Sequence, residues 1–373
     1  MRKPHQHRTG EAGFSLPELL IAMVIVLVVM AATMTSVGNA YRSAENSRGI
    51  IDLNNNLRIG ADLMVRDLIQ VGQGLPTGRV VQVPNGNGAL RIQRPHPQGS
   101  TCTQWDAGIV VLPAVTVGPG CGPVVNGVAT DMVTTLAVDS VLDTVPVNSF
   151  NLNAHTATVS TAAQATGGLD ISTGSGDDVE VGDLMMFTKG SVSALVYVTT
   201  FDGNQTFTFA AGDPMNLNQF AVALNGTVDD LANTAPTTAN SANVSRIRMI
   251  SYYLDNTIDP TTPRLMRHMN WGAPALPVNQ RGMTVAFAID NLQFTYDMVD
   301  GVTNPAGVKI VAADLAGTGR CAPSACSPNQ IRKVNVYLAG RSTQAFSLTR
   351  RFFRNALETQ VSLRSLALVN RYQ

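Results

Sequence analysis

The chain has 373 residues and carries 26 basic and 26 acidic side chains, so it has no formal net charge. This length suggests one large domain or two modest ones. The charge balance argues against a dedicated nucleic-acid binder, which normally presents a basic face. The middle of the chain is rich in Gly, Ala, Val, Thr, Ser and Asn, a mixture that favours strands and turns.

The first predicted element is a long apolar helix near the N-terminus. Its sequence, residues 11–34, reads EAGFSLPELLIAMVIVLVVMAATM. Between residues 14 and 34 a helix would be about 31 Å long, enough to cross a hydrocarbon core of about 30 Å. Three basic residues precede it, namely Arg2, Lys3 and Arg8. By the positive-inside rule, the N-terminus stays cytoplasmic and the rest of the chain is exported.

An acidic residue, Glu18, lies near the start of this apolar segment. A secretory signal peptide cleaved after Gly38-Asn39-Ala40 would leave Glu18 without a role, and so would a plain membrane anchor. An ionised acid near lipid is unfavourable by up to about 2.5–3.5 kcal/mol on insertion scales. An acid in this position therefore indicates a functional site, provided that a partner for it exists.

Glu18 closes a short motif, Gly13-Phe14-Ser15-Leu16-Pro17-Glu18, which runs directly into the apolar helix. This motif resembles the class III signal of type IV pilins. The resemblance implies that prepilin peptidase cleaves between Gly13 and Phe14 and that Phe14 becomes N-methylated. It also implies that Glu18 pairs with the terminal amine of a neighbouring subunit. Two charges that are unfavourable in lipid would then neutralise each other on assembly.

Helical periodicity continues beyond the apolar segment. Apolar residues recur there at steps of three and four, namely Leu53, Leu57, Ala61, Met64, Leu68 and Val71. Between them lie Asp52, Asn54, Asn56, Arg58, Asp62, Arg66, Asp67 and Gln70. The pattern predicts a helix that continues to the breaker sequence 72–76 and packs its apolar stripe against a globular domain. Gly38 is expected to soften the junction between the two halves.

The end of this helix carries a second resemblance. The pattern Met64-Val65-Arg66-Asp67-Leu68, followed by Gly72, is similar to that of the PilW family of minor pilins. The minor pseudopilin J of type II secretion shares much of this pattern. The C-terminal segments ISYYLDN, PRLMR, IDNLQFTYDMVDG, IRKVNVYLAGRS and RRFF…LETQVSLRS follow the strand order of the PilW family. Arg66 and Asp67 themselves are interpreted as part of the solvated face of the helix.

The predicted fold class is therefore α+β and type IV pilin-like. A leader peptide is expected at 1–13 and a spine helix at 14–75, with the first half of the helix in the membrane. A large, antiparallel, β-rich extracytoplasmic domain is expected at 76–373.

Turn sequences and alternating apolar residues place the strands of this domain. Hairpins are predicted at 79–93, around Asn85-Gly86-Asn87-Gly88, and at 193–209, around Asp202-Gly203. Further strands are predicted at 108–117, 183–188, 244–254, 283–296, 331–339 and 360–368. The segment 211–242 lacks periodicity and is predicted to be a long loop or an insertion.

The four cysteines form two pairs that are local in sequence: Cys102 with Cys121, and Cys321 with Cys326. An even number of cysteines suits disulfides in an oxidising compartment. Their spacing, and the absence of histidines near them, does not favour a zinc site. Because short loops close readily, we expect each local pair to form a disulfide.

The sequence contains no recognised catalytic motif, whether H-x-x-x-H, G-x-S-x-G or a phosphate-binding loop. We therefore expect no enzymatic activity, no cofactor and no metal ion. Two acidic clusters, 177–183 and 255–259, lack the EF-hand spacing and are interpreted as solvated turns. From Arg341 onward the chain has six arginines and one acid, Glu358. That excess favours a charged strand edge over a DNA contact.

The expected function is that of a non-catalytic minor pilin. Such a protein would wait as a single-pass protein of the bacterial inner membrane, with its domain in the periplasm. It would then join other minor pilins and the major pilin in a tip complex that primes pilus polymerisation. The expected partners are prepilin peptidase, those pilins and membrane lipid, and no nucleic acid. The alternatives are a type II secretion pseudopilin and a tip adhesin or DNA-binding module.

Overall fold

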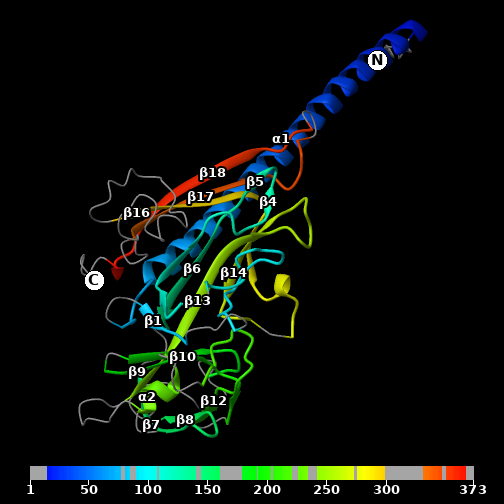
Figure 1. The fold of residues 1–373 in the computed structure, drawn as a ribbon. Helices are drawn as coiled ribbons and strands as arrows, with labels where there is room; N and C mark the ends of the chain where they lie inside the picture. Colours follow the sequence, from blue (N-terminus) through cyan, green and yellow to red (C-terminus); the bar gives the residue numbers. More distant parts are fainter. Residues whose placement is uncertain are drawn as a thin grey trace, which may run out of the picture.

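A long helix projects from a β-rich domain in the computed structural model (Figure 1). Helix α1 (Leu16–Gln70) has 55 residues and is therefore about 82 Å long. Its N-terminal half extends beyond the domain, and its C-terminal half lies along the sheets. The structure describes residues 15–76, 80–84, 90–106, 109–139, 144–159, 179–190, 192–202, 205–220, 226–233, 242–272, 275–298, 331–346 and 350–366. The predicted α+β fold class is confirmed.

The second half of α1 packs its predicted apolar stripe against the domain. All six residues of the stripe are at most 3% exposed: Leu53, Leu57, Ala61, Met64, Leu68 and Val71. The helix continues through Gly38 without a break. It ends just before Gly72 and Gly74, whose φ angles of 74° and 72° are left-handed conformations that favour glycine. The breaker sequence therefore stops the helix where expected.

Strand β13 (Asn243–Asp255) is the central element of the larger sheet, which is antiparallel. Its direct partners, from its first residues to its last, are β7 (Val145–Asn151), β9 (Leu184–Lys189), β6 (Met132–Val138) and β14 (Arg264–Met269). The sheet continues through β10 (Val192–Tyr197), β8 (Thr156–Val159), β12 (Thr206–Thr208), β11 (Thr200–Phe201), β3 (Val115–Gly118) and β15 (Met283–Phe287). One long strand thus joins the part of the sheet beside α1 to the part that lies farthest from the projecting N-terminal half of α1 (Figure 1).

A three-stranded antiparallel sheet lies beside α1 and has the order β16 (Ile289–Met298), β17 (Ile331–Arg341), β18 (Arg354–Ser362). Two smaller pairs complete the strands of the described chain. They are β1 (Val80–Gln82) with β2 (Val111–Pro113), and β4 (Val124–Val125) with β5 (Val128–Ala129). Helix α1 contacts β6, β15, β17 and β18, so both larger sheets contribute to its seat.

The apolar interior falls into two main clusters. The first joins the stripe of α1 to the inner faces of β6, β13 to β17 and their neighbours. The second fills a distal lobe, which we define as β7 to β12 with the short helix α2 (Val228–Asn233). Its centre is Phe187, whose ring lies 5.1 Å from Phe150 and 5.7 Å from Phe207 between centroids. The distal lobe lies beyond the C-terminal end of α1 (Figure 1).

Several strand predictions are confirmed and others are wrong. The strands predicted at 183–188, 244–254 and 331–339 correspond to β9, β13 and β17. The hairpin predicted at 193–209 is confirmed only next to Asp202, where β11 pairs with β12, because β10 pairs with β9 instead. The hairpin predicted at 79–93 is wrong, because β1 pairs with β2 instead. The strand predicted at 283–296 is divided at Ala288, whose φ angle is 55°. The last strand begins at Arg354 instead of residue 360, and α2 interrupts the predicted loop at 211–242.

Candidate functional site on the N-terminal helix

The first turn of α1 places the Glu18 carboxylate over the helix N-terminus. Ser15 is the N-cap residue, and Pro17 lies in the first turn, where its missing N–H has little consequence. The Glu18 side chain turns back and accepts hydrogen bonds from the Ser15 backbone N–H at 3.0 Å and from the Ser15 hydroxyl at 2.9 Å. Gly13 and Phe14 lie outside the described residues, so their predicted processing stays a prediction.

Beyond this turn the helix presents an apolar surface on all sides. Its large apolar side chains from Leu16 to Val37 are between 50% and 77% exposed. Glu18 is the one charged residue between Ser15 and Tyr41. Within the described residues, α1 is the one helix that is long and apolar enough to cross a membrane. The arrangement therefore combines a single carboxylate with a surface that water does not solvate well.

A carboxylate in this position can neutralise an amine within reach of the helix N-terminus. In the present structure its partner is the cap of its own helix, because the backbone N–H and the hydroxyl of Ser15 both donate to it. A carboxylate near a helix N-terminus is also favoured by the helix dipole. A free amine in the same apolar surroundings would carry a full positive charge. It would compete with Ser15 for the Glu18 carboxylate. The site therefore offers one negative charge on an otherwise apolar surface.

Farther along α1, Asp67 anchors the helix to the larger sheet. The interpretation of Asp67 as part of the solvated face is wrong, because Asp67 is only 8% exposed. Its carboxylate accepts a hydrogen bond from the Tyr252 hydroxyl at 2.5 Å and from Arg267 Nε at 2.6 Å. Tyr252 on β13 and Arg267 on β14 are direct cross-strand partners, so two strands converge on one helix residue. Arg66, in contrast, is exposed as predicted.

The electrostatics of this anchor follow from burial and from the charge of Asp67. Tyr252 is fully buried, and burial together with the negative charge of Asp67 raises the pKa of its phenol. Tyr252 therefore remains protonated and acts as a hydrogen-bond donor. The sequence did contain an indication that Asp67 is buried. Asp67 follows Gly60 and Met64 and precedes Val71 at steps of three and four. Those positions lie on the buried face of the helix.

Gly60 lets the helix approach the sheets closely. A Cβ atom at this position would lie 2.9 Å from a methyl carbon of Leu265 and 3.3 Å from one of Leu338. Leu265 belongs to β14 and Leu338 to β17, so the helix rests in the angle between the two sheets. The glycine weakens the helix by roughly 1 kcal/mol relative to alanine and permits this contact.

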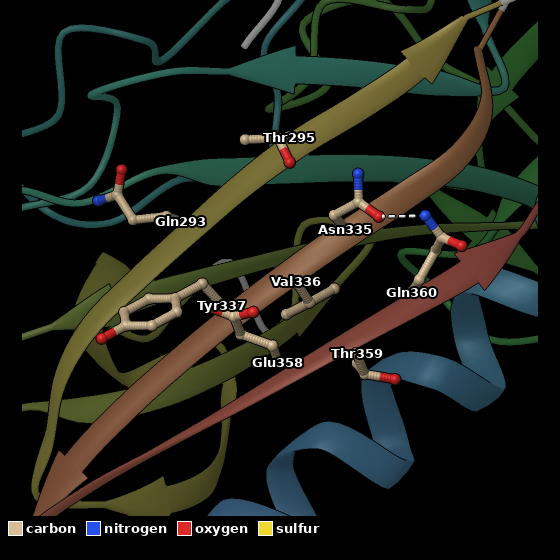
Figure 2. Close-up of a pocket in the computed structure, with 8 residues that line it drawn as sticks. All are labelled: Gln293, Thr295, Asn335, Val336, Tyr337, Glu358, Thr359 and Gln360. Atoms are coloured by element: carbon tan, nitrogen blue, oxygen red, sulfur yellow. Dashed lines mark hydrogen bonds between the residues drawn. The ribbon is translucent and has the colours of Figure 1, made fainter. Parts of the chain in front are cut away.

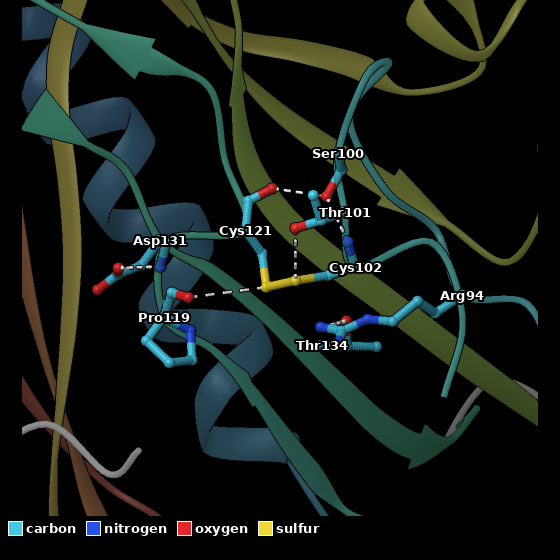
Figure 3. Close-up of a disulfide and its surroundings, with 9 residues drawn as sticks. Arg94, Ser100, Thr101, Cys102, Pro119, Cys121, Asp131 and Thr134 are labelled. Atoms are coloured by element: carbon cyan, nitrogen blue, oxygen red, sulfur yellow. Dashed lines mark hydrogen bonds between the residues drawn. A yellow bond between two sulfur atoms is a disulfide. The ribbon is translucent and has the colours of Figure 1, made fainter. Parts of the chain in front are cut away.

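A disulfide between Cys102 and Cys121 stabilises the domain beside β6 (Figure 3). It confirms one of the two predicted pairs, whereas Cys321 and Cys326 lie outside the described residues. The Ser100 hydroxyl donates to the Cys121 carbonyl at 2.7 Å, and the Asp131 carboxylate accepts from the Gly120 N–H at 2.8 Å. The cross-linked residues are 19 apart, which corresponds to about 3 kcal/mol of loop-closure entropy.

The outer face of the three-stranded sheet forms a polar hollow of about 530 Å³ (Figure 2). The side chains on this face come from alternate positions of the strands, namely Gln293, Thr295, Asn335, Tyr337, Glu358 and Gln360. Gln360 donates to the Asn335 side-chain oxygen at 2.8 Å and to Asp297 at 3.0 Å. The surface offers amide and hydroxyl groups, one aromatic ring and one exposed carboxylate, a set suited to a neutral ligand with many hydroxyl groups.

The acidic clusters considered for calcium are engaged in local contacts where the structure describes them. Asp255 forms an ion pair with Arg264, and Asp259 accepts a hydrogen bond from the Thr261 N–H at 2.8 Å. Asp183 accepts from the Glu180 N–H at 3.0 Å and lies 3.4 Å from Arg246. Among the described residues no group of three or more His, Cys, Asp or Glu side chains could hold a metal ion.

Comparison with known families identifies one segment. Residues 8–34 match the family model for the prokaryotic N-terminal methylation motif. No curated protein and no solved structure matches the chain significantly. The matched segment contains the predicted cleavage site, Glu18 and the apolar start of α1. It supports a type IV pilin or pseudopilin subunit, a class of structural proteins that prepilin peptidase processes and that assemble with other pilins.

Proposed function

We propose that this protein is a minor pilin, similar to the PilW family, that helps to prime a type IV pilus as part of a tip complex. The observation that carries the proposal is the placement of Glu18. It is the sole charge on an exposed apolar helix segment, one turn from the predicted cleavage site. A structural subunit that is drawn from a membrane into a bundle of apolar helices requires this arrangement.

Processing and assembly are coupled in this proposal through two charges. Cleavage after Gly13 leaves a new terminal amine on Phe14. In lipid that amine and the Glu18 carboxylate are each unfavourable, and each becomes neutralised when the amine of one subunit meets the carboxylate of another. Because neither charge is satisfied in this way by lipid, the pair favours association and sets the axial register of the helices.

The shape of the domain favours a place at the tip. Subunits taken from the membrane join a filament at its base, so each subunit except the tip has earlier subunits beyond its distal end. The distal lobe extends past the C-terminal end of α1 (Figure 1), so in a filament it would compete for space with an earlier subunit. A subunit of this shape fits best where nothing lies above it, in few copies per filament.

The test is deletion of the gene, followed by complementation with the wild-type chain. We expect surface filaments to disappear on deletion and to return on complementation, while secretion of exoproteins stays normal. Mass spectrometry of the membrane-bound protein should find methylated Phe14 as the first residue. Loss of secretion with normal filaments would identify a type II secretion pseudopilin instead. A mature N-terminus at Tyr41 would refute both assignments.

The polar hollow on the outer face of β16, β17 and β18 favours a second candidate function, ligand capture at the pilus tip. Its amides, hydroxyls and Tyr337 match the hydroxyl groups and flat apolar faces of a saccharide better than the phosphates of DNA. Tyr337→Ala should reduce attachment to a glycan-coated surface while filament number stays normal. Unchanged attachment would leave priming of the filament as the function of the domain.

A further inference from the structure

The connection between β17 and β18 forms an arginine-rich tip at one end of the domain. We define the arginine tip as the described residues 341–346 and 350–354. Between residues 341 and 354 the chain has four arginines, three phenylalanines and no acid. Arg350 and Arg351 are exposed, and the Arg354 side chain is 62% exposed. Phe352 is 40% exposed and lies against Arg341, whose guanidinium carbon is 4.3 Å from the ring centroid.

The arginine tip lies at the end of the domain that faces the apolar part of α1. Ser342 lies beside Gly49 of the helix, with its Cβ 3.8 Å from where a Gly49 Cβ would be, and Asn355 donates to Asn54 at 2.7 Å. Figure 1 shows the β17–β18 connection on the side from which the helix projects. Tyr41, an exposed aromatic residue just after the apolar segment, is eight residues from Gly49, or about 12 Å along the axis.

We propose that the arginine tip binds the anionic lipid headgroups of the membrane in which α1 is anchored. This inference rests on the membrane-anchored state of the proposed function. The aromatic residue Tyr41 is of the kind that marks a membrane interface, and 12 Å is roughly one and a half times the Debye length of about 8 Å at physiological salt. The tip extends from the strand ends at the level of Gly49 toward the membrane side, so the attraction of its arginines to the lipid surface is partly screened at physiological salt and stronger at low salt. An exposed phenylalanine suits the same interface.

The balance of charge on the tip supports an anionic partner. Asp290 lies 3.5 Å from Arg341 and 3.4 Å from Arg354, and it offsets part of their charge. The neighbouring helix segment has no net charge, because Arg42 and Arg48 are matched by Glu45 and Asp52. The excess positive charge therefore comes from the hairpin itself. Clusters of basic residues next to a membrane-spanning helix are attracted to anionic lipids in this way.

DNA is the other anionic partner that arginines can bind, and the geometry favours lipid. A DNA-binding surface needs phosphate contacts spread along a groove or stripe. The arginine tip is compact, and two of its four arginines share Asp290. Its position beside the helix also directs it toward the bilayer for as long as the subunit is anchored. The exposed Phe352 gains little from a phosphate backbone but gains from contact with lipid.

The test compares the full-length protein in nanodiscs of phosphatidylcholine alone and of phosphatidylcholine mixed with phosphatidylglycerol. We expect amide hydrogen exchange in the arginine tip to slow by about threefold or more in the anionic discs, and high salt to remove the difference. A variant with Arg350→Gln and Arg351→Gln should lose most of the difference in exchange between the two kinds of disc. Arg364→Gln, which changes an exposed arginine beyond the other end of β18, should retain it. Exchange in β13 reports that each variant is folded.

Equal exchange in both kinds of disc would overturn the proposal. Slowing that appears only when double-stranded DNA is added would overturn it in favour of nucleic-acid binding. These measurements need no other pilin and no filament. Failure of the lipid contact is therefore distinguishable from failure of the proposed function. The proposed function is tested separately, by filament counts and by the mature N-terminus.

Discussion

Asp67 is the residue through which a single charge holds the spine helix on the sheet. Its carboxylate serves the Tyr252 hydroxyl and the Arg267 guanidinium, and these partners lie 185 and 200 residues away in sequence. Hydrogen bonds to charged groups each contribute about 1.5–3 kcal/mol. A buried ion pair contributes little net stability while it is intact, but losing one partner is strongly destabilising. Asp67 is therefore a position where a small chemical change should have a large effect.

Asp67→Asn should lower the free energy of unfolding of the domain by about 3 kcal/mol. The amide keeps the shape of the side chain and leaves Arg267 without a counter-charge. The value lies at the low end of the range for buried pairs because the Arg267 side chain keeps 16% exposure. Chemical unfolding of the full-length protein in detergent, followed by the fluorescence of the buried Trp105 and Trp271, measures the change.

Two matched variants control this prediction. Tyr252→Phe removes one hydrogen-bond donor to the Asp67 carboxylate but leaves the ion pair with Arg267 intact, and it should cost about 1.5 kcal/mol. Arg66→Gln changes the exposed neighbour and should stay within about 0.5 kcal/mol of the wild type. If Asp67→Asn were as mild as Arg66→Gln, the anchor would contribute nothing to the seating of the helix.

Glu18 is the residue whose charge the proposed assembly depends on. Glu18→Gln should leave membrane insertion and cleavage intact, since neither requires the charge, and an amide is easier to place in lipid than a carboxylate. Assembly should fail in part, because the terminal amine of the neighbouring subunit would be buried without a counter-charge, a penalty of about 3–5 kcal/mol. Filament counts beside an immunoblot of the processed protein would show fewer pili at normal protein level. Normal piliation would contradict the role of Glu18.

At the scale of elements, the contact between α1 and the two sheets depends on the small size of Gly60. Gly60→Val should destabilise the domain by about 1–3 kcal/mol, because the added carbons meet methyl groups of Leu265 and Leu338 in a packed interior. The larger side chain should also push α1 away from β14 and β17. The midpoint of thermal unfolding measures the first effect, and amide exchange along the buried stripe of α1 measures the second.

Gly49 provides the matched control on the same helix. A Cβ there would lie 3.8 Å from Ser342, which is an ordinary contact distance. Gly49→Ala should therefore stabilise the protein by up to about 1 kcal/mol, through the better helix propensity of alanine. If both substitutions stabilised the protein, helix propensity would explain the results, and close packing at Gly60 would not.

At the scale of the whole molecule, the features that the sequence predicted are those with a local cause. The buried stripe of α1 follows from a repeat of three and four residues, and the helix end follows from Gly72 and Gly74. Strand β13 was recognisable because apolar and β-branched residues accumulate over its length. The pair formed by Cys102 and Cys121 could be predicted from proximity in sequence.

The features that escaped prediction depend on partners distant in sequence. The turn-forming residues at 85–88 suggested a hairpin, but β1 pairs with β2, about thirty residues farther on. Strand pairing is set by the packing of whole faces, and turn residues alone do not choose the partner. Asp67 was assigned to the solvated face because an isolated acid normally lies there. Only the tertiary structure reveals Tyr252 and Arg267 across from it.

Two buried histidines near Trp271 make the stability of the molecule depend on pH. His96 and His268 are 8% and 1% exposed. Burial is the main reason that the pKa of both is lowered to about 4, and for His96 the nearby His268, Arg94 and Arg281 contribute to this lowering. His268 lies 3.0 Å from the Tyr253 hydroxyl and 3.2 Å from the Trp271 carbonyl. A neutral ring satisfies both contacts, with one nitrogen accepting and the other donating.

Acidification should therefore destabilise the folded domain between pH 6.5 and about pH 4. In that window the unfolded chain binds protons at both histidines and the folded chain does not, so stability is complete above pH 6.5 and falls as the pH decreases. A shift of this size corresponds to about 3 kcal/mol per histidine. Urea unfolding at pH 7.5 and pH 4.5 would measure the loss for the wild type and for His268→Gln. The variant should be less stable than the wild type at pH 7.5, because the amide fills the site poorly, but it should lose less stability on acidification. An identical loss in both proteins would mean that other groups cause the pH dependence.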